Sequence, residues 1–163
     1  MPSKEKIVIQ DVETPVGKMQ LGAYGDKLCL CSWKLTKRLV EFGIISDDTS
    51  SSQIILEARQ ELDEYFAGKR KAFDIPLEMI GTDFQKSVWQ ALLTIPFGKT
   101  VSYLDIAQRV GDPRGVRAVA QAIGANPLAI FVPCHRVIGS NGSLTGFAGG
   151  LDAKRYLLEI EKN

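Results

Sequence analysis

The hydrophobic pattern of the chain changes near residue 80, and this change limits the folds that the sequence can adopt. Before it, "KIVIQDVET" and "GKMQLGAY" are extended stretches joined by a "TPVG" turn, and "YGDK" turns into "LCLCSW". These stretches predict an antiparallel meander, followed by a loop over residues 42–53. A helix comes next, because Ile55, Ala58 and Leu62 keep helical spacing, serines precede them and Gly68 can end the helix.

Helical signals dominate after residue 80. We expect helices that begin at Thr82 or Asp83, at Ser102, at Asp112 with Pro113 in its first turn, and at Asp152, the first of them reaching Ile95. The sequence therefore predicts an α/β (α+β) fold. Residues 1–80 form an N-terminal domain with an antiparallel sheet and a helix, and residues 81–163 form a helical domain with a helix-turn-helix.

Length and composition fit an ordinary globular protein. The chain has 163 residues, of which 45% are hydrophobic and 24% charged. No apolar run reaches the roughly 18 residues that a membrane span needs, and the stretch "MPSKEKIVIQDVETP" does not read as a signal peptide. We expect a cytoplasmic protein without a membrane partner.

Three cysteines, Cys29, Cys31 and Cys134, are an odd number without a secretion signal, which argues against a disulfide framework. Strand alternation predicts that Cys29 and Cys31 share one face. A metal site is one interpretation of this pair, and two buried small hydrophobic residues are the other. The second is favoured because a zinc site needs four ligands and the chain has a single histidine, so we expect neither metal nor cofactor.

The formal net charge of +1 hides an asymmetry between the two halves. Basic residues outnumber acidic ones after residue 80, and between Phe84 and Gly150 only Asp105 and Asp112 oppose the basic residues. The basic residues of that stretch are Lys86, Lys99, Arg109, Arg114, Arg117 and Arg136. This excess suits an anionic partner, although an ordinary solvated surface would explain it equally well.

The stretch "YLDIAQRVGDPRGVRAVAQAIG" fits a DNA-binding helix-turn-helix, and it also fits any helical hairpin. Its second helix offers few of the side chains that read base edges in the major groove. It is instead rich in small residues, which would allow close approach to a backbone or a narrow groove. Packing against the neighbouring helix is the alternative explanation for those alanines.

The motif "PCHRV" places the only histidine, His135, next to Cys134. A thiolate is the nucleophilic form of cysteine, and a nearby imidazole is the simplest way to activate the thiol. Neighbours in an extended strand point to opposite faces, so the chain must bend at this point or a water must relay the proton. A cysteine–histidine pair alone would serve a protease or another acyl transferase as well.

The run "NPLAIFVPCHRVIGSNGSLTGFAGGLDAKRYLLEIE" closely resembles the O6-alkylguanine-DNA alkyltransferases, also called methylated-DNA–protein-cysteine methyltransferases. The resemblance extends back through "GANP", the helix-turn-helix and "FGKTVSY" to "GTDFQKSVW", and more loosely through the first 80 residues. It implies DNA repair by irreversible, single-turnover transfer of the alkyl group of O6-alkylguanine, or less readily O4-alkylthymine, to the protein's own cysteine. The implied partner is double-stranded DNA bound by a monomer in the minor groove, with the base flipped out.

The resemblance also implies roles for individual residues. Cys134 matches the acceptor, His135 the base that acts through a water, Glu161 the group that orients the histidine, and Tyr103 a proton donor to the leaving guanine. Asn126 matches the asparagine between the recognition helix and the active-site segment, and Arg117 the arginine that replaces the flipped nucleotide. The other implied DNA-binding residues are Gly115, Ala118, Ala120, Arg114, Ser140 and Arg136. Thr145, Gly146, Phe147, Ala148 and Gly149 match the loop that closes on the base.

The sequence departs from some relatives at two points, and three of these residues also have a plainer structural interpretation. Ala148 replaces a serine of some relatives, so no side chain can bond O6 at that position and a backbone N–H is the expected alternative donor. The histidines of a zinc site found in some relatives are absent. Glu161 could equally be a solvated residue, Tyr103 a core residue and Arg117 a surface arginine.

Two other classes of protein are alternatives to an alkyltransferase. A DNA-binding module or regulator that recognises alkylated bases without repair would need no nucleophile, and a cysteine hydrolase would need no helix-turn-helix.

Overall fold

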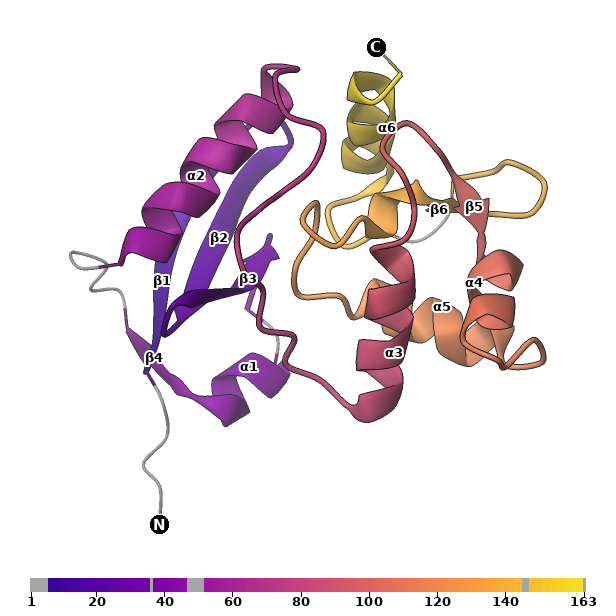
Figure 1. Ribbon diagram of the computed structural model, residues 1–163, viewed down its shortest axis with the longest axis horizontal. Coiled ribbons are helices and arrows are strands. Elements are labelled where there is room, and N and C mark those ends of the chain that lie inside the picture. Colours follow the sequence, from indigo (N-terminus) through magenta and orange to yellow (C-terminus); the bar gives the residue numbers. More distant parts are fainter. Residues whose placement is uncertain (1–5, 36, 47–51, 145–146, 163) are drawn as a thin grey trace. The chain divides into compact units, whose positions relative to one another are not determined.

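The computed structural model describes residues 6–35, 37–46, 52–144 and 147–162. The chain divides into two compact units, Met1–Ile80 and Gly81–Asn163 (Figure 1). The first is built on a sheet and the second mainly on helices, which confirms the predicted fold class. No helix within the described ranges is both long and apolar enough to cross a bilayer.

A four-stranded sheet with strand order β3-β2-β1-β4 forms the first unit. Strands β1 (Lys6–Thr14), β2 (Gly17–Tyr24) and β3 (Lys27–Ser32) pair antiparallel, so the predicted meander is confirmed. Helix α2 (Gln53–Phe66) packs against β2 and β3 and buries Ile55, Ala58 and Leu62 (Figure 1). The Ser52 hydroxyl caps this helix by accepting a hydrogen bond from the Ile55 N–H at 3.2 Å.

Two elements of the first unit were not predicted. Helix α1 (Lys37–Phe42) leads into strand β4 (Ile44–Ser46), which pairs parallel to β1 with Lys6 opposite Ile44. The prediction of a loop over residues 42–53 is therefore wrong at β4. The hydrogen bonds that hold this strand come from β1, which is far away in sequence. The local sequence pattern therefore could not predict them. Residues 47–51 lie outside the described ranges.

The two cysteines of β3 do not share a face, so that prediction is also wrong. The pairing of β2 and β3 shifts register between Gly22 and Ala23, which leaves an extra residue in β3. Cys29 consequently packs beside Leu30 in the cluster that contains Ile7 and Ile9. Cys31 lies opposite Leu21, one step further along and on the other face. Burial raises the pKa of Cys29 to about 12, as expected for an inert core thiol.

The second unit packs short elements around three mutually contacting helices. These helices are α3 (Asp83–Leu92), α4 (Tyr103–Arg109) and α5 (Val116–Gly124). The 3-10 turn η1 (Cys134–Arg136) contacts the last helix, α6 (Leu151–Ile160), and strands β5 (Val101–Ser102) and β6 (Val137–Ile138) pair parallel. The predicted caps Thr82 and Ser102 are confirmed, and each completes a capping box with the residue three positions on.

Two helix boundaries differ from the predictions. Helix α3 ends at Leu92 and not at Ile95, because the Thr94 hydroxyl donates to the Ala91 carbonyl at 2.6 Å and the last turn tightens. Helix α5 begins after Gly115 and not after Asp112. The Asp112 carbonyl accepts a hydrogen bond from the Gly115 N–H at 3.0 Å, so these residues form a separate turn before the helix.

Trp89 fastens α5 to α3. Its indole Nε1–H donates to the Ala122 carbonyl at 2.8 Å, and the ring is almost completely buried. A Cβ added to Gly81 would lie 2.5 Å from the edge of this ring, so the chain can pass here only as glycine. Gly124 in α5 has no such neighbour, since a Cβ there would meet nothing within 4 Å.

Gly81→Ala should therefore lower the free energy of unfolding by about 1–3 kcal/mol, the usual cost of forcing an extra methyl group into a packed site. Gly124→Ala is the matched control, and it should raise the same free energy by about 0.5–1 kcal/mol because alanine favours a helix. Urea denaturation of both variants measures the difference. Equal effects of the two substitutions would contradict the packing argument.

Candidate active site

Cys134 lies at the start of η1, after a buried segment that Asn126 holds in place. The Asn126 side chain donates to the Val132 carbonyl at 2.9 Å and accepts from the Leu128 N–H at 3.0 Å. Within that segment Ile130 has φ of 76°, and it is the one non-glycine residue with positive φ among those described. A buried β-branched residue rarely adopts this conformation. The chain then turns at Cys134, so the bend that the sequence offered as one of two alternatives, the other being a water relay, is present.

Cys134 is a buried residue, 7% exposed, and its thiol forms no disulfide. Burial raises the pKa of this thiol above its ordinary value. The Asn126 amide and the positive charge of Lys154 act in the opposite direction, because both favour a thiolate. The net effect keeps the sulfur protonated at neutral pH, and a base is needed before it can attack.

That base is available in the next residue, which belongs to a buried chain of polar groups. His135 Nε2 lies 2.6 Å from Glu161 Oε2, and the Arg136 Nε–H donates to Glu161 Oε1 at 2.7 Å. A carboxylate beside a guanidinium is ionised and accepts only, so the Nε2 atom must carry the proton. The lone pair of a neutral His135 then lies on Nδ1, which is buried and has no hydrogen-bond partner among the described residues.

Opposing forces act on the pKa of His135. Burial lowers it, the hydrogen bond and charge of Glu161 raise it, and the charges of Arg136 and Lys154 lower it again. The net direction is downward from the ordinary value. The imidazole is therefore neutral at pH 7 and can accept a proton.

Lys154 is a member of this site that the sequence analysis missed. It is 1% exposed, and its ammonium group lies 5.9 Å from the centroid of the Tyr103 ring. Burial lowers the pKa of Lys154, and the negative charge of a Cys134 thiolate would raise it. The signal was present in the sequence, because position 154 shares one helical face with the apolar Leu157 and with Glu161, which the resemblance assigned to the site.

The helix-turn-helix is formed by α4 and α5. Tyr103 is the first residue of α4 and is half-buried. Helix α5 buries Val119, Ala122 and Ile123. Elsewhere on the helix Arg117 and Ala118 are exposed and Ala120 is half-buried. Just before the helix Arg114 is exposed and Gly115 half-buried, so small residues and two cations share the outer surface.

The remaining predicted residues are distributed over the surface and the interior. Ser140 and Ala148 are exposed, Phe147 and Gly149 are half-buried, and Thr145 and Gly146 lie outside the described residues. Arg136 requires a correction, since it was predicted to bind DNA. It is buried, and its guanidinium is engaged by Glu161 and by the Ile95 carbonyl, so the structure places it in the interior and not on the exposed surface.

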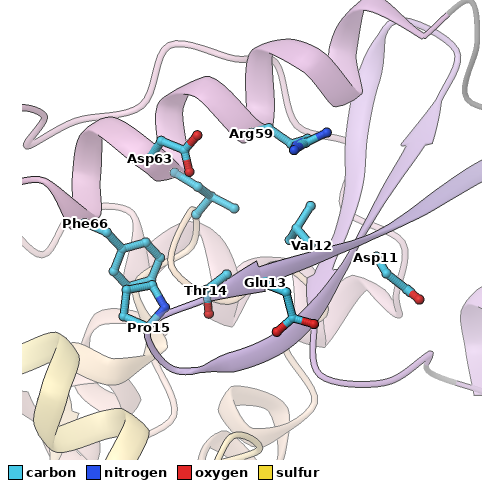
Figure 2. Close-up of a pocket in the computed structure, with 9 residues that line it drawn as sticks. Asp11, Val12, Glu13, Thr14, Pro15, Arg59, Asp63 and Phe66 are labelled. Atoms are coloured by element: carbon cyan, nitrogen blue, oxygen red, sulfur yellow. The ribbon is translucent and has the colours of Figure 1, made fainter.

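A cavity in the first unit contains none of the predicted residues. It has a volume of about 480 Å³ and lies between α2 and the end of β1 (Figure 2). Val12 points toward α2, whereas Asp11 and Glu13 point away from the helix (Figure 2). Asp11 is paired with Lys18 at 3.1 Å. Across the described residues no group of three or more His, Cys, Asp or Glu side chains could hold a metal ion.

Comparison with known proteins identifies the family. Two family models match: the ribonuclease-like domain of 6-O-methylguanine DNA methyltransferase over residues 8–79, and its DNA-binding domain over residues 83–163. A methylated-DNA–protein-cysteine methyltransferase of Methanosarcina barkeri is 45% identical, over 93% of this chain and 95% of its own length. The constitutive enzyme of that name from Bacillus subtilis is 46% identical, over 92% of each chain.

Solved structures agree with this assignment. The crystal structure of Mycobacterium tuberculosis O6-methylguanine methyltransferase matches with a TM-score of 0.82 and 41% identity, covering 96% of this chain and 93% of that one. A structure of Mycobacterium tuberculosis OGT in complex with DNA matches with a TM-score of 0.81 and 44% identity, covering 94% and 92%. The chain belongs to the methylated-DNA–protein-cysteine methyltransferase family.

The buried carboxylate should dominate the stability of this unit. Glu161→Gln keeps the shape of the side chain but leaves the Arg136 charge uncompensated in the interior, so the free energy of unfolding at pH 7 should fall by about 3–5 kcal/mol. Glu159→Gln removes a carboxylate whose pair with Lys162 is 62% and 69% exposed, and it should cost less than about 1 kcal/mol. Chemical denaturation of the two variants compares them directly. Similar losses of unfolding free energy in the two variants would show that the buried Glu161 carboxylate stabilises the unit no more than the exposed one.

Proposed function

We propose that the protein repairs DNA by removing the alkyl group from O6 of guanine, and less readily from O4 of thymine, and transferring it to Cys134. In this proposal the residues 81–163 bind DNA and accept the alkyl group, and the residues 1–80 form a separate domain. The reaction is a displacement at an sp³ carbon. The bond from the carbon to O6 breaks with its electrons on the base, a carbon–sulfur bond forms, and the product is a thioether.

The proton balance assigns roles to the neighbouring residues. His135 takes the Cys134 proton on Nδ1, through a water, while Glu161 holds the other ring nitrogen. The departing guanine anion needs a proton, which Tyr103 supplies. Asn126 orders the segment before the nucleophile and stabilises the thiolate. None of these groups could cleave a thioether, so each chain reacts once.

The observation that carries this proposal is the buried chain from Glu161 through His135, next in sequence to the free thiol of Cys134. A protein that only recognises alkylated bases would gain nothing from this arrangement. The Mycobacterium tuberculosis relative that was solved with DNA supports DNA as the partner. The helix-turn-helix and its exposed Arg117 argue against a cysteine hydrolase.

We propose that the protein binds DNA as a monomer, through the minor groove of the duplex. Gly115, Ala118 and Ala120 leave little bulk on the outer side of α5, which suits close approach to a narrow groove. Arg117 occupies the gap left by the flipped base, and Arg114 and Ser140 contact phosphates. The loop around Phe147, Ala148 and Gly149 closes on the base, with a backbone N–H bonding O6.

Cys134 should be the only acceptor. Intact mass measured after incubation with an O6-methylguanine oligonucleotide should increase by one methyl group in place of one hydrogen, and peptide mapping should place the group on Cys134. Cys134→Ser should bind the same DNA and transfer nothing, because the hydroxyl is far less acidic than the thiol. Cys31→Ser is a suitable control, since this buried thiol lies in the first unit. A methyl group found on Cys29 or Cys31 would refute the assignment.

Arg117→Ala should slow repair of duplex DNA far more than reaction with the free base O6-methylguanine, which needs no flipping. The side chain compensates part of the unstacking cost, about a few kcal/mol. Arg114→Ala is the control, because loss of a phosphate contact should mainly weaken binding and lower the salt slope by about one unit. Single-turnover rates on both substrates separate the two roles. Equal slowing of both reactions by Arg117→Ala would mean that the residue supports the active site instead.

A further inference from the structure

Arg136 makes several hydrogen bonds beside the active site, although the reaction as described above does not use it. Its Nε–H donates to Glu161 Oε1 at 2.7 Å, and an Nη2–H donates to Glu161 Oε2 at 3.1 Å. A third bond runs from Nη1 to the Ile95 carbonyl at 2.7 Å, and the guanidinium lies 5.7 Å from the centroid of the Phe97 ring. The group is thus bidentate on the carboxylate and anchored to the turn after α3.

Glu161 Oε2 is shared between two partners, and this sharing couples Arg136 to the base. The oxygen that accepts from Arg136 at 3.1 Å is also the one that lies 2.6 Å from His135 Nε2. The other charged group that acts on His135 is Lys154, from α6, and a thiolate at Cys134, when it forms, acts on Lys154. The Gly98 N–H also reaches Glu161 Oε1, at 3.4 Å.

We propose that Arg136 is a positioning residue that neutralises Glu161, so that His135 stays uncharged in the resting protein and Nδ1 remains free to take the proton of Cys134. The inference rests on the proposed alkyl transfer, in which His135 is the base. It assigns to Arg136 an electrostatic role within the site, in place of the DNA contact that the sequence suggested.

If Arg136 were absent, another group would have to hold a proton to balance the charge of Glu161. An ionised carboxylate alone in the interior is costly, and it attracts a positive charge to itself. The nearest group able to supply one is His135, which would become an imidazolium paired with Glu161. A charge of opposite sign within hydrogen-bonding distance changes a pKa by about 1–3 units. An imidazolium has no lone pair left, so it could not accept the thiol proton.

The sign of the pH dependence follows from this argument. Removing the Arg136 charge removes a repulsion that opposes protonation of His135, so the pKa of His135 should rise. The base is then protonated up to a higher pH than in the wild type. The acidic limb of the pH–rate profile should move toward alkaline pH by about one unit or more, with partial recovery of the rate at high pH.

The experiment compares Arg136→Gln, Arg136→Lys and the control Arg155→Gln. Glutamine keeps a donor toward Glu161 without the charge, and lysine keeps the charge without the bidentate geometry. Arg155 is an exposed residue paired with Asp152 at 3.0 Å, so its loss should change nothing. The readouts are the pH profile of single-turnover alkyl transfer and an NMR titration of the imidazole, which is unambiguous because the chain has one histidine.

The expected result is an upward shift of both the titration and the acidic limb in Arg136→Gln, and a smaller shift in Arg136→Lys. Slower transfer in both variants with an unchanged titration would overturn the proposal and leave Arg136 a structural anchor. Weaker DNA binding with an unchanged profile would overturn it in favour of a DNA contact.

The NMR measurement needs no substrate, so it separates this inference from the proposed function. Failure of the wild-type protein to transfer an alkyl group would refute the function while the titration still tests Arg136. If Arg136→Gln does not fold, the wild-type protein remains informative. Its ¹⁵N shifts should show a neutral ring at pH 7 with the proton on Nε2, and a protonated ring at that pH would overturn the proposal.

Discussion

The rest of the second unit depends on the hydrogen bonds and ion pair made by the buried carboxylate of Glu161. Glu161 follows the last turn of α6, yet it binds two side chains of η1, and Arg136 extends the connection to the Ile95 carbonyl. Three segments far apart in sequence therefore meet at one ionised group. Burying a carboxylate is unfavourable unless its charge is compensated and its oxygens are hydrogen-bonded, and here both conditions are met. The position of the histidine ring is fixed as a consequence.

The backbone before the nucleophile is determined in a different way. Asn126 replaces missing backbone partners at both ends of a buried turn, and Ile130 adopts a positive φ that costs about 1–3 kcal/mol. Such a conformation persists only where surrounding contacts over-determine it. The segment held by Asn126 thus leads into Cys134, and the Glu161 carboxylate fixes His135.

Local signals in the sequence predicted much of the fold. The meander, the caps Thr82 and Ser102, and the pair of helices α4 and α5 all follow from turn chemistry and periodicity. What failed depended on contacts distant in sequence or on competition between local bonds. Strand β4 exists because β1 offers it an edge, and the two cysteines of β3 are separated by one bulged residue. Helix α3 stops early because a threonine hydroxyl takes a carbonyl that the helix would have used.

The same distinction applies to the site. A motif specifies which residue types occur together, and it led to Cys134, His135 and Glu161, but it does not say which charges face the solvent. Arg136 looked like a DNA contact because arginine is usually exposed, and only the position of Glu161 in space reveals it as an interior residue. Lys154 was overlooked for the converse reason, since a buried lysine is rare although its helical position pointed inward.

Arg136 and Lys154 act on different groups in the proposed proton transfer. Before the reaction the thiol and the imidazole are both neutral, and Arg136 balances Glu161. Transfer of the proton creates a thiolate and an imidazolium within the same buried region. Lys154 stabilises the thiolate directly, and Glu161 stabilises the imidazolium, while both cations disfavour the latter. The balance favours the neutral pair at rest. Such an arrangement would protect a nucleophile that can be used once.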